Sequence, residues 1–252
     1  MFDLAQDGRI ARISLNRSGA RNAIRIADWA DLADIAERAV AEGARTVIIR
    51  SAVTGIFSAG ADLVELEALP GDAVGQRRMR TAMCGALDRL SRLPVATIAA
   101  IDGGCFGAGV ALVMACDLRI GGHMAQFAIP PARLGIGYPQ EDIARLVALV
   151  GPGQAARLML TGERIGADEA HRIGLIEAVA HSAHGAVNNL AALCSESSPA
   201  SVVMLKRAIA AAAAGERSGA VFDEAFERAF DGADFAEGIL AMRERRAPDF
   251  GA

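Results

Sequence analysis

Apolar and polar positions along the chain predict strands that alternate with helices. Residues 2–15 hold two alternating apolar–polar runs around Asp7-Gly8, the pattern of a β-hairpin. Further short apolar runs predict strands at 46–50, 95–101, 118–121 and 175–180. Longer segments with apolar residues every three or four positions predict helices at 28–42, 72–93, 139–150, 153–161 and 167–173. This alternation indicates an α/β fold.

The pattern changes at Ala183, after which the chain is almost entirely helical and is divided by Pro199. We therefore expect an α/β core of residues 1–182 and a C-terminal helical region of residues 183–252. Apolar stripes in this region need a surface to cover them, either in the same subunit or in a neighbour; they include Phe222, Phe226, Phe230 and Leu240. We expect this region to serve in oligomerisation.

The most informative segment is 95–117, VATIAAIDGGCFGAGVALVMACD. An apolar strand leads into a loop with four glycines, and a short apolar helix follows. Closely spaced glycines let a backbone approach a ligand, and a helix N-terminus adds positive potential at the same place. A second loop of small residues, IFSAGADL at 56–63, also leads into a helix. Two such sources of N–H groups can converge on one oxygen, which is the logic of an oxyanion hole.

Composition narrows the possible partners. Hydrophobic residues make up 52% of the 252 positions, and the net charge of −4 argues against a nucleic-acid surface. The four cysteines form no CxxC pair, and His181-x-x-His184 lacks acidic or thiol partners, so no metal site is expected. No basic and apolar leader is visible, and no apolar run reaches the roughly 18 residues of a membrane span. We expect a cytoplasmic protein with reduced thiols.

Several motifs occur together in a fixed order: Leu15-Asn16-Arg17, Asn22-Ala23, the FSAGADL loop, the AIDGGCFGAGVAL segment with Cys116-Asp117, Leu160-Thr161-Gly162, ADEAHRIGL at 167–175, and the segment 234–250. With these motifs the chain resembles the enoyl-CoA hydratase/isomerase family, the crotonase superfamily, over nearly its whole length. The resemblance implies a spiral of ββα units assembled as trimers or pairs of trimers. It also implies an acyl-CoA substrate, with coenzyme A carried by the substrate and no separate cofactor.

The resemblance assigns the oxyanion-hole donors to the backbone N–H groups of Ala61 and Ala108, the latter at a position where the family often has glycine. Residues expected to surround the substrate are Ala59, Gly60, Asp62, Leu63, Gly107, Ala111 and Pro131. Asp62 also suits the N-cap of the helix that follows it. Arg21 and Arg25 are candidates for contact with the coenzyme A phosphates.

Three positions depart from the family pattern. The two glutamates that activate water in family hydratases fall on Ala111 and Pro131, neither of which exchanges a proton. The family's lysine that contacts coenzyme A falls on Val64. The scaffold and the oxyanion hole are thus expected to be intact, while hydration by two glutamates is not.

Replacement polar groups lie just downstream, in LGIGYPQED at 134–142. Tyr138 is the only tyrosine of the chain and matches a pocket tyrosine of family members that decarboxylate malonyl-type thioesters. Its phenol could bind a substrate carboxylate or deliver a proton. Glu141 begins a helix and is a second candidate for proton transfer. The resemblance therefore leaves decarboxylation, isomerisation and hydrolysis open as reactions.

Three rival functions each account for part of the sequence. A dinucleotide-binding fold accounts for GGCFGAG, but no acidic residue follows at the required distance. A serine peptidase needs a GxSxG elbow, which the sequence lacks. A non-catalytic acyl-CoA-binding protein that kept the fold and lost the glutamates remains open.

Overall fold

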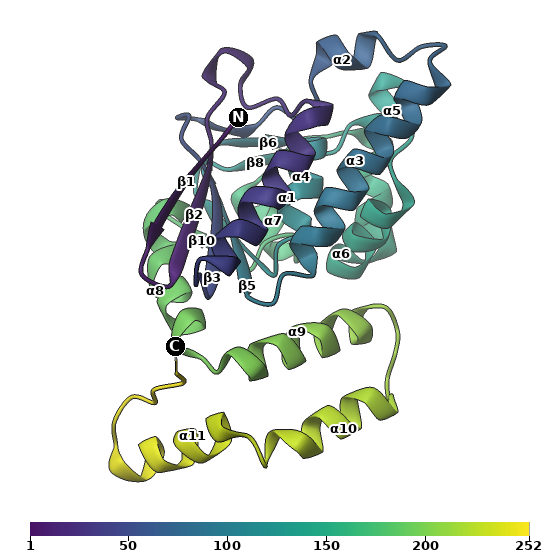
Figure 1. Ribbon diagram of the computed structural model, residues 1–252. Helices are drawn as coiled ribbons and strands as arrows, with labels where there is room; N and C mark the ends of the chain where they lie inside the picture. The colour runs from purple at the N-terminus through teal and green to yellow at the C-terminus, as the bar shows by residue number, and fades with distance from the viewer. Residues whose placement is uncertain (252) are drawn as a thin grey trace.

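A computed structural model of the chain describes residues 1–251. Its larger sheet has six strands in the order β1-β2-β3-β5-β7-β10 (Figure 1). The strands are β1 Phe2–Asp7, β2 Ile10–Leu15, β3 Thr46–Ser51, β5 Ala96–Ile101, β7 Leu118–Gly122 and β10 Ala178–Ala180. Only β1 and β2 pair in antiparallel fashion, which confirms the predicted hairpin. The other pairs are parallel.

A second, smaller sheet was not predicted from the hydrophobic pattern. Its order is β4-β6-β8-β9, and its strands are β4 Ile56–Ser58, β6 Gly104–Phe106, β8 Gln126–Ala128 and β9 Ile165–Gly166. Strands of two or three residues are too short to show an alternation of apolar and polar positions. The two segments that we had interpreted as loops therefore each contain a strand of this sheet.

The chain repeats one supersecondary unit. In each repeat, one strand enters the larger sheet, the next enters the smaller sheet, and one or two helices follow. The three successive repeats are β3-β4 with α2 Leu63–Glu67 and α3 Ala73–Ser91, β5-β6 with α4 Ala108–Met114, and β7-β8 with α5 Pro131–Leu134 and α6 Gln140–Thr161. This arrangement confirms the α/β class and the spiral of ββα units.

The remaining helices are η1 Ser18–Ala20, α1 Ile26–Ala41, α7 Ala167–Arg172, α8 Ala183–Glu196, α9 Pro199–Ala213, α10 Ala220–Ala229 and α11 Ala233–Glu244. Two expected helices at 139–161 form one element, α6, which breaks at Gly151 where φ is +74°. The first long helix, α1, begins two residues before the expected Asp28. Asp28 lies in its first turn and accepts a hydrogen bond from the Arg25 backbone at 2.9 Å.

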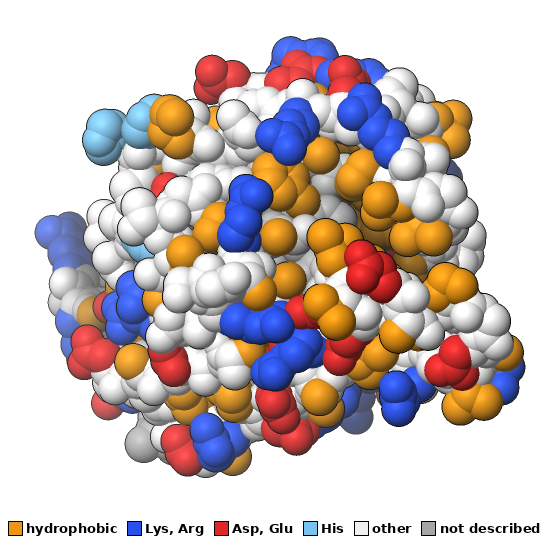
Figure 2. All heavy atoms as spheres, turned by 90° about the horizontal axis from the view of Figure 1, so that it is seen from above, with side chains coloured by type: hydrophobic (Ala, Val, Ile, Leu, Met, Phe, Trp, Pro, Cys, Tyr) orange, Lys and Arg blue, Asp and Glu red, His pale blue; other side chains and the backbone are white. Residues whose placement is uncertain are grey.

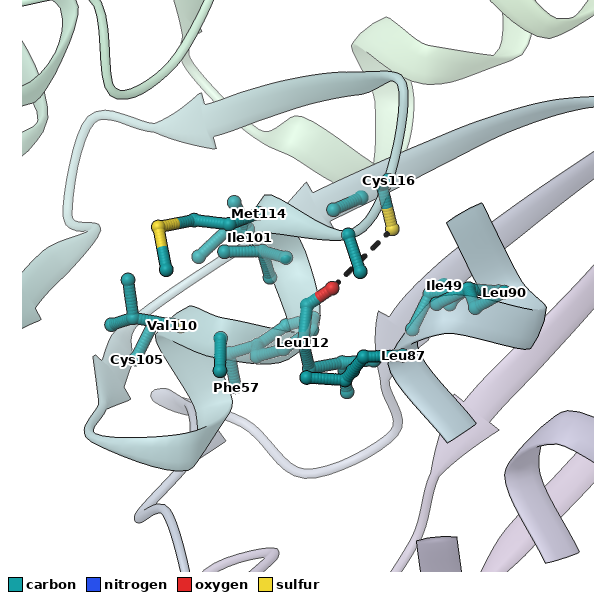
Figure 3. Packing of buried hydrophobic residues seen from close by; sticks show 14 of the residues in the cluster. Ile49, Phe57, Leu87, Leu90, Ile101, Cys105, Val110, Leu112, Met114 and Cys116 are labelled. Atoms are coloured by element: carbon teal, nitrogen blue, oxygen red, sulfur yellow. Dashed lines mark hydrogen bonds between the residues drawn. The ribbon is translucent and has the colours of Figure 1, made fainter. Parts of the chain in front are cut away.

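The main core lies between the larger sheet and helices α1, α3, α4 and α6. Every residue of α4 is buried. Figure 3 shows part of this cluster, with Leu112 of α4 among Leu87 of α3, Phe57 of β4 and Ile49 of β3. The helix that carries Ala108 is therefore fixed by packing along its whole length.

The opposite face of the larger sheet is covered by α8, whose Ala183, Val187 and Ala191 pack against Ile48 and Ile98. Helices α9, α10 and α11 lie below the sheets in the view of Figure 1. Of the region expected to form the C-terminal helical unit, α8 packs on the larger sheet, and α9 is joined to the core through Lys206, which pairs with Asp117 and donates to the Val95 carbonyl.

Helix α6 is the one helix among residues 1–251 that is long and apolar enough to cross a membrane by length and composition. It contains the Gly151 break followed by Pro152, and it packs against α4 and α5. Leu146, Val150 and Leu158 are buried in the main core. These contacts place one face of α6 against the main core.

The segment before the small-residue loop 56–63 touches the glycine-rich loop at Gly103. A Cβ on this residue would lie 2.2 Å from the carbonyl carbon of Gly55, and its φ of +83° is a conformation that favours glycine. The Gly104 N–H donates to the Gly55 carbonyl at 3.1 Å. Backbone therefore meets backbone directly where the two repeats join.

We predict that Gly103→Ala lowers the free energy of unfolding by about 2–5 kcal/mol, since it adds both a backbone clash and left-handed strain. Gly85→Ala is the matched control. Gly85 is exposed on α3 with open space around it, so alanine there should raise the free energy of unfolding by about 0.5–1 kcal/mol. Urea denaturation of both variants measures the difference. Equal stabilities would contradict the close approach.

Candidate active site

The site forms where the loop after β4 meets the loop after β6. A Cβ on Gly60 would lie 2.8 Å from the Phe106 carbonyl oxygen and 3.3 Å from the Ala108 nitrogen. Gly60 also has a φ of +100°. Glycine is therefore needed both for this backbone angle and because a Cβ would clash with the Phe106 carbonyl. The two segments that were predicted to supply N–H donors are thereby in backbone contact.

The direction of the Ala61 N–H follows from a short parallel bridge. Ile24 donates to the Gly60 carbonyl at 2.8 Å and accepts from the Asp62 N–H at 3.0 Å. In a parallel bridge the residue between these two partners points its own N–H and C=O away from the bonded strand. The Ala61 N–H therefore points away from Ile24, and within residues 1–251 it donates to no other group.

Ala108 is the first residue of α4, so its N–H has no partner within the helix. It also donates to no other group in the part of the chain that the structure describes. The preceding Gly107 has φ +49° and ψ −118°, which sets the orientation of the peptide that carries this N–H. Ala61 and Ala108 thus supply two unpaired donors from adjoining loops.

A buried polar network holds the first loop in place. The Asn22 side-chain amide donates to the Ser51 hydroxyl at 2.8 Å and to the Phe57 carbonyl at 3.0 Å. The Ser58 hydroxyl donates to the Asn22 carbonyl at 2.8 Å and accepts from the Gly60 N–H at 3.1 Å. Sequence reasoning assigned no role to Asn22 or Ser58, although Asn22 belongs to one of the recognised motifs.

Asp62 closes the loop from the other side. Its carboxylate caps α2 by accepting from the Val64 N–H at 3.0 Å, as predicted, and it also pairs with the Arg17 guanidinium at 2.5 Å. The hydrogen bond from Arg17 lowers the pKa of Asp62, so the carboxylate stays charged at neutral pH. Leu63, the next residue, is 64% exposed at the start of α2.

The two positions of the family glutamates are apolar and buried. Ala111 is fully buried in α4, and Pro131 is the buried first residue of α5. Neither side chain can accept or donate a proton. The structure therefore places no carboxylate at either position.

Tyr138 lies in the loop between α5 and α6, and its ring packs against the main core. Its hydroxyl donates to the Gly107 carbonyl oxygen at 3.0 Å. Burial raises the pKa of the phenol well above its ordinary value, so the hydroxyl keeps its proton. The structure thus brings Tyr138 to the peptide that carries the Ala108 N–H.

Glu141 is exposed in the first turn of α6, where it faces Cys84 of α3 with a sulfur–oxygen distance of 3.8 Å. Burial, with Asp142 and Glu141 nearby, raises the pKa of the Cys84 thiol to about 11. The neighbouring Asp142 is completely buried, pairs with Arg145 at 2.7 Å and has a pKa raised by burial. No role was assigned to Asp142 from the sequence.

The two arginine candidates differ in their surroundings. Arg25 is held by Asp28 through hydrogen bonds of 3.0 and 2.8 Å. The exposed Arg21 adjoins the donor loop, since its carbonyl accepts from the Ala59 N–H at 2.9 Å. Figure 2, which looks down on the end of the molecule with α2 and α5, shows a hollow bordered by hydrophobic atoms with basic side chains close by.

Comparison with known proteins gives a consistent result. The family profile described as enoyl-CoA hydratase/isomerase matches residues 5–252. A relative from Mus musculus, enoyl-CoA hydratase domain-containing protein 2, mitochondrial, is 32% identical over 252 residues, which cover 96% of this chain and 84% of the relative.

Solved structures agree with this result. An enoyl-CoA hydratase/isomerase family protein from Hyphomonas neptunium superposes with a TM-score of 0.94 at 32% identity and covers 99% of this chain and 97% of its own. An enoyl-CoA hydratase/carnithine racemase from Magnetospirillum magneticum gives a TM-score of 0.93 at 29% identity, covering 100% and 95%. Because the family profile, the relative and the solved structures agree over nearly the whole length, the chain belongs to the enoyl-CoA hydratase/isomerase family.

Proposed function

We propose that this protein is an enzyme that acts on a coenzyme A thioester by stabilising an enolate between the N–H groups of Ala61 and Ala108. The observation that carries the proposal is the pair of unpaired backbone donors on adjoining loops. Donors fixed in advance stabilise a developing oxyanion without the reorganisation that water requires. Coenzyme A belongs to the substrate, and the proposal involves no metal and no separate cofactor.

Three reactions fit this arrangement. When a proton or a carboxylate leaves the carbon next to the thioester, the electron pair passes to the carbonyl oxygen as an enolate, which leads to isomerisation or decarboxylation. In hydrolysis the same oxygen carries the charge of a tetrahedral intermediate. Hydration by two glutamates is not proposed, because Ala111 and Pro131 stand where those groups would be.

Binding of coenzyme A is proposed at the entrance formed by α2 and the loop after α5. Leu63, Val64, Leu134 and Ile136 are each more than half exposed and offer apolar contacts there. Of the two arginine candidates, Arg21 is the better phosphate ligand, because Arg25 is already engaged with Asp28. Gly60 and Gly107 keep side chains away from the thioester path.

The alternative is a non-catalytic acyl-CoA-binding protein of the same fold. The apolar residues at the two glutamate positions favour it.

For the enzyme, in contrast, we assign proton transfer to Glu141, because this side chain is exposed and so can exchange a proton with solvent. Binding of a panel of acyl-CoA thioesters without turnover of any of them would establish the alternative.

The first prediction concerns the donor at Ala108. Replacement by proline removes the N–H, and proline is well suited to the first position of a helix. We expect Ala108→Pro to fold and to lose turnover by about 10²–10³-fold. Steady-state assays on the most active thioester measure the loss.

Ala233→Pro is the control for this variant. It places proline at the first position of α11, after a glycine whose ψ of 147° suits the residue before proline. Its turnover should equal that of the wild type. Equal turnover in Ala108→Pro and wild type would remove the oxyanion hole from the proposal.

The absence of carboxylates at positions 111 and 131 predicts slow hydration. Crotonyl-CoA hydration by the wild type should fall far below the rate of about 10 s⁻¹ that is typical of enzymes. Glu141→Gln should lower turnover of malonyl-type or β-keto thioesters by about 10²–10⁴-fold, because it removes basicity and keeps shape. Glu67→Gln, an exposed change in nearby α2, is the control. Rapid hydration would show that another group activates water, and full activity of Glu141→Gln would exclude Glu141.

Self-association as a homotrimer or hexamer is proposed on the basis of helices α9 to α11. Their large apolar side chains remain exposed in the single chain; Leu205, Ile209, Val221, Phe226, Phe230, Phe235, Leu240 and Met242 are each at least 44% exposed. An apolar surface of this extent is typical of an interaction site. It therefore needs a partner, and a second copy of the chain is proposed.

We predict a trimer or hexamer by light scattering at micromolar concentration. Replacing Phe226 and Phe230 by serine together should shift the particle toward the monomer, because both rings are more than half exposed on the single chain. A wild-type protein that stays monomeric would contradict the assembly.

A cytoplasmic location is also proposed. Within residues 1–251 the four cysteines are unpaired, as expected for a reducing compartment. Some relatives, including the one from Mus musculus, are named as mitochondrial.

A further inference from the structure

The contact between Tyr138 and Gly107 bears on the donor strength of the oxyanion hole. The carbonyl oxygen that accepts a hydrogen bond from the phenol, at an oxygen–oxygen distance of 3.0 Å, belongs to the same amide as the Ala108 N–H. A trans peptide directs its C=O and its N–H to opposite sides. The amide therefore receives a hydrogen bond from Tyr138 on one side and presents its N–H on the other.

The amide transmits this hydrogen bond. Resonance couples the oxygen and the nitrogen of a peptide, so a donor at the oxygen draws electron density from the nitrogen and makes its N–H a better donor. Chains of hydrogen bonds strengthen one another in this way by roughly 10–30% per bond. The Gly107 oxygen also accepts from the Val110 N–H at 2.9 Å and the Ala111 N–H at 3.3 Å, which adds to the same polarisation.

The orientation of this amide is set by the Gly107 backbone angles and by hydrogen bonds from the backbone and from Tyr138. Gly107 has φ +49° and ψ −118°, and a Cβ built there would meet nothing within 4 Å. Its conformation thus needs glycine because of the backbone angles and not because of space. The phenol adds a side-chain hydrogen bond to the backbone bonds that Val110 and Ala111 make to the same carbonyl, and so helps to hold the amide in this orientation.

We propose that Tyr138 is a positioning residue for the oxyanion hole, which it serves by holding and polarising the Gly107–Ala108 amide so that the Ala108 N–H is aimed and strengthened toward the substrate carbonyl. This inference rests on the proposed function. It differs from proton delivery, because the proton stays on the phenol oxygen and is only hydrogen-bonded to the Gly107 carbonyl. The raised pKa of the buried phenol is consistent with a hydroxyl that acts only as a donor.

The test uses the fact that Tyr138 is the only tyrosine in the chain. Biosynthetic incorporation of 3-fluorotyrosine or 3,5-difluorotyrosine then changes the acidity of this one phenol and leaves ring and hydroxyl in place. The probe is butyryl-CoA with carbon-13 at the thioester carbonyl, and the readout is its stretching band by infrared difference spectroscopy. A stronger oxyanion hole moves this band to lower frequency.

The wild type should lower the frequency of the carbonyl band on binding. The shift should grow from tyrosine to 3-fluorotyrosine to 3,5-difluorotyrosine, and it should shrink in Tyr138→Phe. Turnover of the most active thioester should fall about tenfold in Tyr138→Phe with KM little changed, a smaller loss than removal of a donor causes. In Ala108→Pro the band should no longer respond to fluorination, because the N–H that transmits the effect is gone.

The possible outcomes distinguish a failure of the Tyr138 role from a failure of the oxyanion hole itself. If bound butyryl-CoA shows no shift in the wild type, the oxyanion hole itself fails and the role of Tyr138 fails with it. If the wild type shifts the band and neither fluorination nor Tyr138→Phe changes it, only the role of Tyr138 is overturned. The fluorotyrosine proteins keep the test decisive even if Tyr138→Phe does not fold.

Discussion

The site depends on one constraint, the direct contact of two backbone segments at 55–61 and 103–109. A Cβ on Gly103, Gly60 or Gly109 would lie 2.2, 2.8 or 2.8 Å from the nearest heavy atom of the facing segment. Because each contact excludes a side chain, the segments that carry Ala61 and Ala108, which belong to different ββα repeats, approach each other closely. The buried Asn22–Ser58 network and the fully buried α4 then fix the two sides of this contact. The core thus supports the site by holding the main chain.

Under the proposed function, the donors belong to the main chain and depend on backbone conformation, so alanine can supply them at positions 61 and 108. Acid–base groups are side chains, and the side chains of Ala111 and Pro131 carry no group that exchanges a proton. Three polar side chains lie nearby, on the segment 138–142 that leads into α6. Tyr138 is hydrogen-bonded to the Gly107 carbonyl, Glu141 is exposed, and Asp142 is buried and paired with Arg145.

The C-terminal helices are anchored at one end and open at the other. Lys206, the only lysine, pairs with Asp117 at 2.8 Å and donates to the Val95 carbonyl at 3.0 Å, which ties α9 to the main sheet. A half-buried ion pair of this kind fixes geometry more than it adds stability. Beyond it, Phe230 packs edge to face with both Phe226 and Phe235, and all three are at least 44% exposed. The exposed apolar surface of α9 to α11 is therefore attached to the core through Lys206 but is not covered by it.

The sequence by itself determined the α/β class, the hairpin, the long helices, the helical C-terminal region and the residues of both donor loops, because these depend on local periodicity, glycine spacing and ordered motifs. It did not reveal the smaller sheet, since strands such as Ile165–Gly166 are too short to carry a pattern. It also did not show that Asp142 is buried while Glu141 is exposed, because adjacent helix positions differ only in what packs on them. The bond from Tyr138 to the Gly107 carbonyl joins residues 31 positions apart. Only the tertiary structure decided it, because hydrogen bonds between distant segments depend on how the repeats pack.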